Sequence, residues 1–117
     1  MKNTRKKGTS GEQIAEKFLT EKGYKILDRN FYFERGEIDI VAEDNGVIVF
    51  VEVKSRSSEE YGEPEDSITP NKRKQLRKVA EGYFYEKNIS DVEARFDVIS
   101  IKWKKGNPII EHIENAF

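Results

Sequence analysis

Acidic side chains and a lysine are concentrated in residues 36–56, which read GEIDIVAEDNGVIVFVEVKSR. The members that could do chemistry are Glu37, Asp39, Glu52 and Lys54. Mg²⁺ prefers oxygen ligands and is commonly held by one or two carboxylates together with water and a substrate phosphate. A lysine beside such an ion can stabilise the charge that develops on a phosphate during hydrolysis. These residue types therefore point to a metal-dependent phosphodiesterase.

The elements that must position these residues are two strands joined by a tight turn. Residues 45–46 are Asn-Gly, the strongest short signal for a β-hairpin. If this pair forms the turn, the register places Asp39 opposite Glu52 and also places Glu37 opposite Lys54. Directly opposed residues share one face of a hairpin, with Cβ atoms roughly 5 Å apart. The register therefore predicts that all four side chains meet.

Burial is what would separate a metal site from an ordinary charged surface. Residues 47–53 form a nearly continuous apolar run, which is typical of a strand covered on both faces. Opposed carboxylates in such surroundings are costly without a cation, and either Lys54 or a bound Mg²⁺ or Mn²⁺ would supply one. The alternative is a cross-strand ion pair between Glu37 and Lys54 beside two surface acids. The apolar flanks favour the metal site.

The rest of the chain predicts two helices and three further strands. Ser10 and Gln13 form a capping-box pattern at the start of a helix that Gly23 closes. Thr69 and Pro70 fit the start of a second helix. In chain order, we expect a helix over 10–23, strands over 24–28 (which 31–33 extend or follow), 37–42 and 47–54, a loop over 55–68, a helix over 70–87, and strands over 94–102 and 108–113. This order, α-β-β-β-α-β-β, predicts an α/β fold with a central mixed β-sheet flanked by helices.

Length and composition indicate one domain and exclude several classes of function. The 117 residues predict a single domain over 10–117, preceded by a flexible basic arm over 1–9. The absence of cysteine excludes disulfides and thiol chemistry. The single histidine, His112, excludes a Ser-His-Asp triad and a multi-histidine zinc site. No apolar run approaches the length of a membrane span, so we expect a cytoplasmic protein without a membrane partner.

A net charge of −1 conceals separated acidic and basic segments. Residues 72–78 carry five cations at the start of the second predicted helix, where positive charge opposes the helix dipole. Contact with a phosphate backbone would account for this arrangement, and it makes Lys72, Arg73 and Arg77 candidates for nucleic-acid binding. Arg56, two residues beyond the lysine of the hairpin, is a further candidate. The alternative is a solvated basic face that pairs with the acidic loop before the helix.

The spacing of Asp39, Glu52 and Lys54 resembles the D…(D/E)-x-K signature of the restriction-endonuclease-like nuclease superfamily. Nearly the whole chain is similar to one branch of it, the YraN-like bacterial family, in the stretches GEQIA (11–15), GYKILDRN (23–30), GEIDIVA (36–42), VFVEVKSR (49–56), RFDVI (95–99) and HIENAF (112–117). The resemblance implies a restriction-endonuclease-like fold, with Asp39 and Glu52 as metal-binding acids and Lys54 as the catalytic lysine. Relatives of the family include archaeal Holliday-junction resolvases, in which an acid on the first helix joins the site, and Glu12 matches that position. Ile38 stands where the superfamily usually has proline, a departure that does not touch the ligands.

Together these features predict a metal-dependent endonuclease that hydrolyses DNA phosphodiester bonds, with branched or single-stranded DNA as candidate substrates. Asp39, Glu52 and Lys54 form the expected catalytic set together with Glu12, and Glu37 is expected to assist at the metal. By analogy with junction resolvases, which cut two strands symmetrically, a homodimer is expected. The alternative from another class is a non-catalytic nucleic-acid-binding or adaptor module that keeps the nuclease fold. Opposed acids favour the enzyme, because a purely binding module has no need of them.

Overall fold

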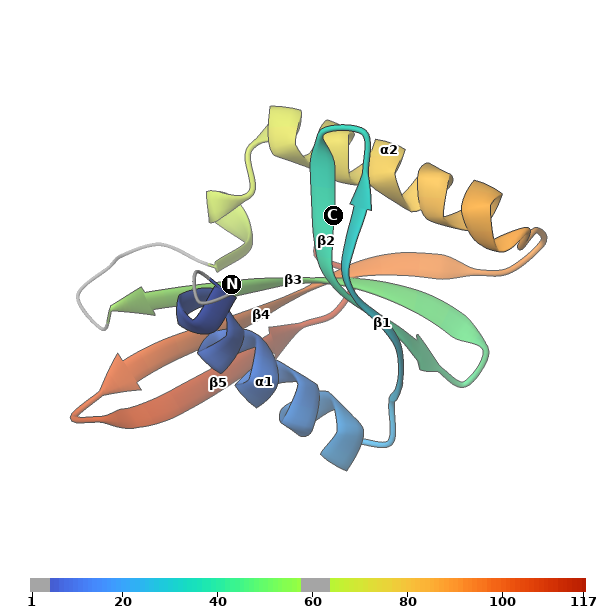
Figure 1. Cartoon of the computed structure of the whole chain (residues 1–117). Coiled ribbons are helices and arrows are strands. Elements are labelled where there is room, and N and C mark those ends of the chain that lie inside the picture. The colour runs from blue at the N-terminus through green and yellow to red at the C-terminus, as the bar shows by residue number, and fades with distance from the viewer. Residues whose placement is uncertain (1–4, 58–63) are drawn as a thin grey trace.

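The computed structural model describes residues 5–57 and 64–117, which form a five-stranded mixed sheet with a helix on each face (Figure 1). In chain order, the elements are α1 (Arg5–Glu21), β1 (Lys25–Phe33), β2 (Gly36–Asp44), β3 (Val47–Ser57), a short 3-10 helix η1 (Pro64–Ser67), α2 (Pro70–Lys87), β4 (Ala94–Lys104) and β5 (Asn107–Ile113). The strands follow one another in the sheet, with β3 and β4 parallel and the other neighbours antiparallel. The predicted α/β class and the order α-β-β-β-α-β-β are confirmed.

Helix α2 lies where the sequence predicted it. Its first residue is Pro70, and the Thr69 side chain accepts a hydrogen bond from the backbone N–H of Lys72 at 3.2 Å. This contact satisfies a backbone donor that the first turn of a helix leaves unpaired. At the other end Asn88 adopts a left-handed conformation (φ 57°) and caps the helix.

Helix α1 ends as predicted but begins earlier. Gly23, at φ +96°, follows its last turn, and the N–H of Tyr24 donates to the carbonyl of Leu19 at 3.0 Å. The predicted start at Ser10 is wrong, because the helix already runs from Arg5 and no proline interrupts its first turns. Residues 1–4 of the predicted arm lie outside the described part of the chain. Neither described helix is long and apolar enough to cross a membrane.

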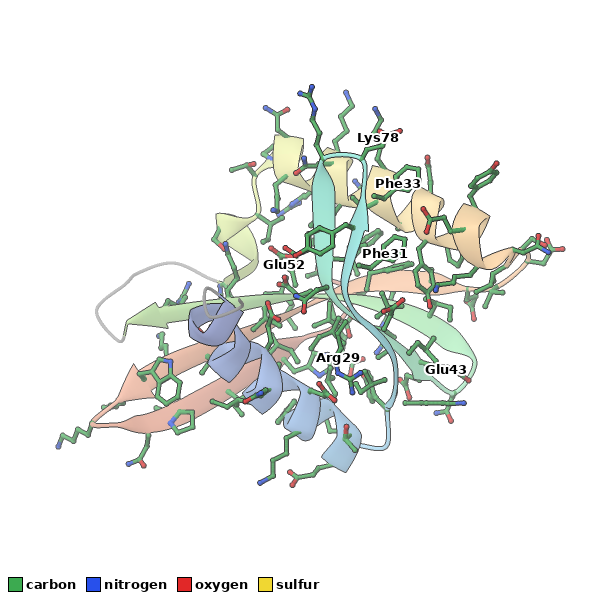
Figure 2. The ribbon with its side chains drawn as sticks, in the orientation of Figure 1. Arg29, Phe31, Phe33, Glu43, Glu52 and Lys78 are labelled. Carbon is green, nitrogen blue, oxygen red and sulfur yellow. The ribbon has the colours of Figure 1, made fainter. Side chains whose placement is uncertain are left out.

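The central strand β3 divides two hydrophobic cores. Ile48 and Phe50 pack in the core that α2 covers, whereas Val49 and Val51 pack in the core that α1 covers. Alternation along one strand sends successive side chains to opposite faces, so this strand is covered on both, as its apolar run predicted. Figure 2 shows Phe31 and Phe33 of β1 on the side of the first hairpin that meets α2.

The hairpin of β2 and β3 has the predicted register only near its turn. Paired positions run from Asp44 opposite Val47 to Ile40 opposite Val51, and the ladder ends there. Beyond this point β2 continues its pairing with β1, while β3 continues its pairing with β4. The predicted pairing of Glu37 with Lys54 is therefore wrong, because the strands have separated before they reach these residues.

A buried ionic network fastens β4 and β5 to the chain end. Asp97 is fully buried and accepts hydrogen bonds from Arg95 Nε (3.0 Å), His112 Nε2 (2.7 Å) and the Asn115 N–H (3.0 Å). His112 Nδ1 lies 2.8 Å from Lys22 Nζ, and an ammonium only donates. The histidine thus accepts at Nδ1 and donates its proton from Nε2 to Asp97. Burial raises the pKa of Asp97, but its donors outweigh burial and hold that pKa below its ordinary value.

We predict that Asp97→Ala lowers the free energy of unfolding by about 3–5 kcal/mol, because it leaves the Arg95 guanidinium partly buried without its main partner. Urea unfolding of the two proteins at neutral pH measures the change. The exposed Glu111 provides a control, and Glu111→Ala should change stability by less than about 0.5 kcal/mol. Equal stabilities of Asp97→Ala and Glu111→Ala would contradict the structural role of the network.

Candidate active site

The site is built where β2 and β3 part. At this point Asp39 Oδ2 accepts a hydrogen bond from the backbone N–H of Val53 at 2.8 Å. The carboxylate thus takes up a backbone donor of β3 beyond the end of the β2–β3 ladder. Ile38 packs in the core under α2 and Ile40 in the core under α1, although only one residue separates them. The strand therefore changes layer at Asp39, which places this carboxylate in the gap between the strands.

Three carboxylates converge beside this gap, one from α1 and two from β2. Glu12 of α1, Glu37 of β2 and Asp39 each offer one oxygen, and these oxygens lie within 4.8 Å of one another. Asn30 of β1 joins two of them, since its Nδ2 donates to Glu12 Oε1 at 3.0 Å and to Glu37 Oε2 at 2.8 Å. Asn30 adopts a left-handed conformation (φ 49°), which asparagine tolerates better than most residues. The carboxylate cluster is thus Glu12, Glu37 and Asp39.

Glu52 lies on the other side of Asp39 and brings two lysines to the site. The Asp39 and Glu52 side chains lie close enough for each to shift the pKa of the other, so these acids meet as predicted although no ladder pair joins them. Lys72 Nζ of α2 lies 3.9 Å from Glu52 Oε2. Lys54, two residues along β3, also acts on the charge of Glu52. Figure 2 shows Glu52 between β2 and the start of α2.

Burial and repulsion make this group of acids costly to ionise together. Burial, followed by the charge of Glu52, raises the pKa of Asp39 to about 8, and Glu12 and Glu37 add to the effect. Burial also raises the pKa of Glu52, although Lys72 and Lys54 oppose this. The two carboxyls therefore hold a proton at neutral pH unless another cation replaces it.

The donor set fits a hard divalent cation. All available ligand atoms are carboxylate oxygens, which suit Mg²⁺ and Mn²⁺, and no histidine or cysteine ligand lies in the cluster. A hollow of about 140 Å³ opens beside Glu12, Asn30 and Asp39, and a water molecule takes up about 30 Å³ in the liquid. Glu16 also lines this hollow, but Arg29 of β1 binds its carboxylate through two hydrogen bonds. The residues that could hold a metal are thus Glu12, Glu37 and Asp39, with Glu52 adjoining.

The predicted phosphate-binding cations lie in different surroundings. Lys72 is at the site, as described above. Arg73 Nε donates to the carbonyl of Ile68 at 2.9 Å, and its guanidinium lies 5.4 Å from the centre of the Phe117 ring. Arg77 lies over Phe117 as well, at 5.8 Å. Arg56 is partly buried on β3 beside β4. The contacts of Arg73 and Arg77 place both guanidinium groups against the chain end.

Two residues of the site were missed by reasoning from the sequence. Asn30 lies in a stretch that resembles the family, but its residue type gave no sign that it would bridge two acids. Tyr32 pairs directly with Glu37 in the β1–β2 ladder, so the two side chains share a face, and 58% of Tyr32 is exposed. Strand alternation in 31–33 could have placed Tyr32 on the face opposite to Phe31 and Phe33, but the pairing of β1 with β2 was needed to bring it beside Glu37.

We predict that, in EDTA, the free energy of unfolding falls as the pH rises from the ordinary Asp39 pKa of 3.8 to about 8. In this window the folded protein binds more protons than the unfolded chain, so deprotonation favours unfolding. Asp39→Asn should remove most of this slope and stabilise the metal-free protein at the upper end by several kcal/mol, since one pKa unit corresponds to about 1.4 kcal/mol. Urea unfolding across this pH range measures both proteins.

The control for this measurement is Asp91→Asn, because Asp91 is exposed and its left-handed conformation (φ 59°) suits asparagine. This variant should keep the slope of the unmodified protein. An Asp39→Asn protein with the same slope would show that the buried carboxyl does not carry the pH dependence.

Comparison with known proteins places the chain among bacterial relatives. The model of the uncharacterised protein family UPF0102 matches residues 11–101, which contain every acid of the site. A UPF0102 protein of Persephonella marina is 49% identical over 111 residues, covering 95% of this chain and 92% of its own length. A UPF0102 protein of Geobacter metallireducens is 49% identical over 110 residues, covering 94% of this chain and 90% of its own length.

One solved structure shows a weaker likeness. The structure of Pyrococcus furiosus SfsA in complex with Ca²⁺ is 18% identical, with a TM-score of 0.38. The match covers 96% of this chain and 64% of that chain. The sequence matches are far stronger and extend over both helices and four strands. On their extent and identity, the chain belongs to the uncharacterised protein family UPF0102.

Proposed function

We propose that this protein is a Mg²⁺- or Mn²⁺-dependent endonuclease that hydrolyses phosphodiester bonds of DNA. The observation that carries the proposal is the half-buried carboxylate cluster of Glu12, Glu37 and Asp39, with Glu52 and two lysines next to it. An ion pair alone would not need three converging acids and a fourth acid beside one of them. Perturbed carboxyls in a hollow are typical of functional sites. The resemblance to the D…(D/E)-x-K signature supports the same chemistry.

Each side chain has a definite part in this proposal. Asp39 and Glu52, with Glu12 and Glu37, would provide the oxygens for the cation. When bound, the cation would polarise the phosphodiester and lower the pKa of a water molecule. Lys54 would place positive charge where negative charge develops on the phosphate. Lys72 holds Glu52 by its ion pair and adds a second positive charge at the mouth of the site.

Hydrogen bonds from Asn30 and from the Val53 N–H hold the acids of the cluster in place. Asn30 donates to Glu12 and Glu37 at the same time, which keeps two like charges close in the absence of a cation. The N–H of Val53 fixes one oxygen of Asp39 and leaves the other for a ligand. Outer contacts of this kind orient metal ligands and tune their affinity. The homodimer expected by analogy stays a prediction.

We predict that the protein cleaves DNA with Mg²⁺ or Mn²⁺ and that EDTA abolishes cleavage. Asp39→Asn and Lys54→Ala should each lower the rate by about 10²–10³, the usual cost of removing one group that stabilises the transition state. Four-way junction, flap, single-stranded and duplex DNA are the substrates to compare by gel electrophoresis. Glu111→Ala, which changes an exposed acid outside the site, is the control.

The outcomes separate the enzyme from its alternative. Cleavage that persists in EDTA, or that is unchanged in both site variants, would exclude the proposed site. Binding of DNA without cleavage in either metal would favour a non-catalytic nucleic-acid-binding module instead.

We further predict that Asn30→Gly weakens Mn²⁺ binding about 10–100-fold, which is the usual effect of removing an outer contact to metal ligands. Glycine keeps the left-handed backbone of Asn30 (φ 49°) and removes only the amide. Asn45→Gly is a matched control, since Asn45 has φ 50° but lies in the exposed hairpin turn. Titration of metal-free protein with Mn²⁺, followed by electron paramagnetic resonance, gives the affinities. Equal affinities of the two variants would remove Asn30 from the site.

A further inference from the structure

The cations of α2 form two groups that differ in what they contact. The first group has partners within the fold. Lys72 pairs with Glu52, Lys87 Nζ lies 3.5 Å from Asp28 Oδ2, and the two arginines contact the aromatic rings near the chain end. The second group is Lys74 and Lys78, which are exposed and form no ion pair with the described residues. Figure 2 shows Lys78 pointing outward from the helix.

Lys74 and Lys78 lie along a cleft between α2 and the tip of the β1–β2 hairpin. The cleft has a volume of about 830 Å³, within the range of about 300–1,000 Å³ that is usual for ligand sites. A third cation, Arg35 in the hairpin turn, also lines it and is exposed without an ion pair among the described residues. Glu34 is the single acid in the lining. Three cations against one acid make the cleft complementary to a polyanion.

The floor of the cleft is apolar and firmly held. Phe33 and Val79 contribute to the lining, and the Phe33 ring lies so close to Gly82 that a Cβ there would meet the ring at 2.3 Å. At the hairpin turn a Cβ on Gly36 would meet the Val79 side chain at 2.4 Å. These contacts fix the hairpin tip on α2. A rigid apolar floor with cations around it suits a ligand that combines phosphates with flat aromatic groups.

We propose that this cleft binds a segment of single-stranded DNA, with phosphates on Arg35, Lys74 and Lys78 and a base over the apolar floor. A single strand fits better than a duplex, because only an unpaired base can leave the stack and enter a cleft. Asn71 and Gln75 also line the cleft, and although Gln75 Nε2 donates to the Arg35 carbonyl at 3.4 Å, the exposed Asn71 offers an amide to a base or a sugar. Residues of one surface could thus bind both the phosphates and an aromatic base of the strand.

The proposal rests on the proposed nuclease function and extends it, because the cleft and the carboxylate cluster lie on the same hairpin. Gly36 lines the cleft, and the next residue, Glu37, belongs to the cluster. Phe33 lines the cleft, and Tyr32 before it is exposed on the face that carries Glu37. A strand that leaves the cleft over the hairpin tip would therefore meet Tyr32 and then the acids. The cleft would hold the DNA beside the bond that the cluster hydrolyses.

The experiment measures binding without catalysis. A fluorescently labelled single-stranded DNA oligonucleotide is titrated with protein in EDTA, and its anisotropy is followed at several salt concentrations. The variant Arg35→Ala, Lys74→Ala, Lys78→Ala should bind at least about tenfold more weakly, and its slope of log K against log salt should fall by about 2, since each phosphate contact on a single strand contributes about 0.7. The unlabelled duplex of the same sequence should compete less well than the single strand.

The control variant removes the same charge from three exposed lysines outside the cleft, Lys17→Ala, Lys25→Ala and Lys104→Ala. It should bind like the unmodified protein, because the three charges that it removes lie outside the cleft. Equal loss in both triple variants, no binding by the unmodified protein, or stronger competition by the duplex would overturn the proposal. Failure of cleavage with intact binding would instead count against the nuclease function alone.

Discussion

The hydrogen bond from the Val53 N–H to Asp39 Oδ2 is the contact on which the candidate site depends. It lies where β2 and β3 stop pairing, so a side chain takes over one donor of β3 where the ladder has ended. Without the separation of the strands, Asp39 would sit in a closed ladder with no space beside it. Because the strands separate, the carboxylate faces a hollow that α1 and β1 can reach. The candidate site therefore forms where the β2–β3 ladder ends.

Both helices contribute to this site from opposite faces of the sheet. Helix α1 covers one core and supplies Glu12, while α2 covers the other and supplies Lys72. The gap between the strands is what allows side chains from both layers to meet. The network around Asp97 does not contact the carboxylate cluster among the described residues, and it fixes β4, β5 and the chain end by satisfied buried charges. Among the described residues, the Asp97 network is thus buried with its partners complete, whereas the half-buried carboxylate cluster forms no ion pair of its own.

This contrast supports a functional reading of the carboxylate cluster. Hydrogen-bond donors lower the pKa of Asp97, whereas burial and neighbouring acids raise the pKa of Asp39 to about 8. The fold supplies hydrogen-bond donors that stabilise the ionised form of Asp97, whereas the surroundings of Asp39 disfavour its ionised form. Such local conflict is expected where a ligand completes the structure. The neighbouring cleft along α2 has the opposite excess, because its lining carries three cations and one acid. A polyanionic ligand in the cleft would neutralise these cations.

Local sequence determined the elements and most of the register. The Asn-Gly turn fixed the pairing from Asp44 to Ile40, and the alternation of β3 fixed its two buried faces, because these depend on neighbours in the chain. Only the tertiary structure decided where the pairing stops, that Glu37 meets Asn30 and not Lys54, and that two arginines of α2 turn to the chain end. The pairing of β1 with β2 and the packing of α1 and α2 set these contacts, and each of them joins residues of different elements. No periodic pattern in a single segment can encode them.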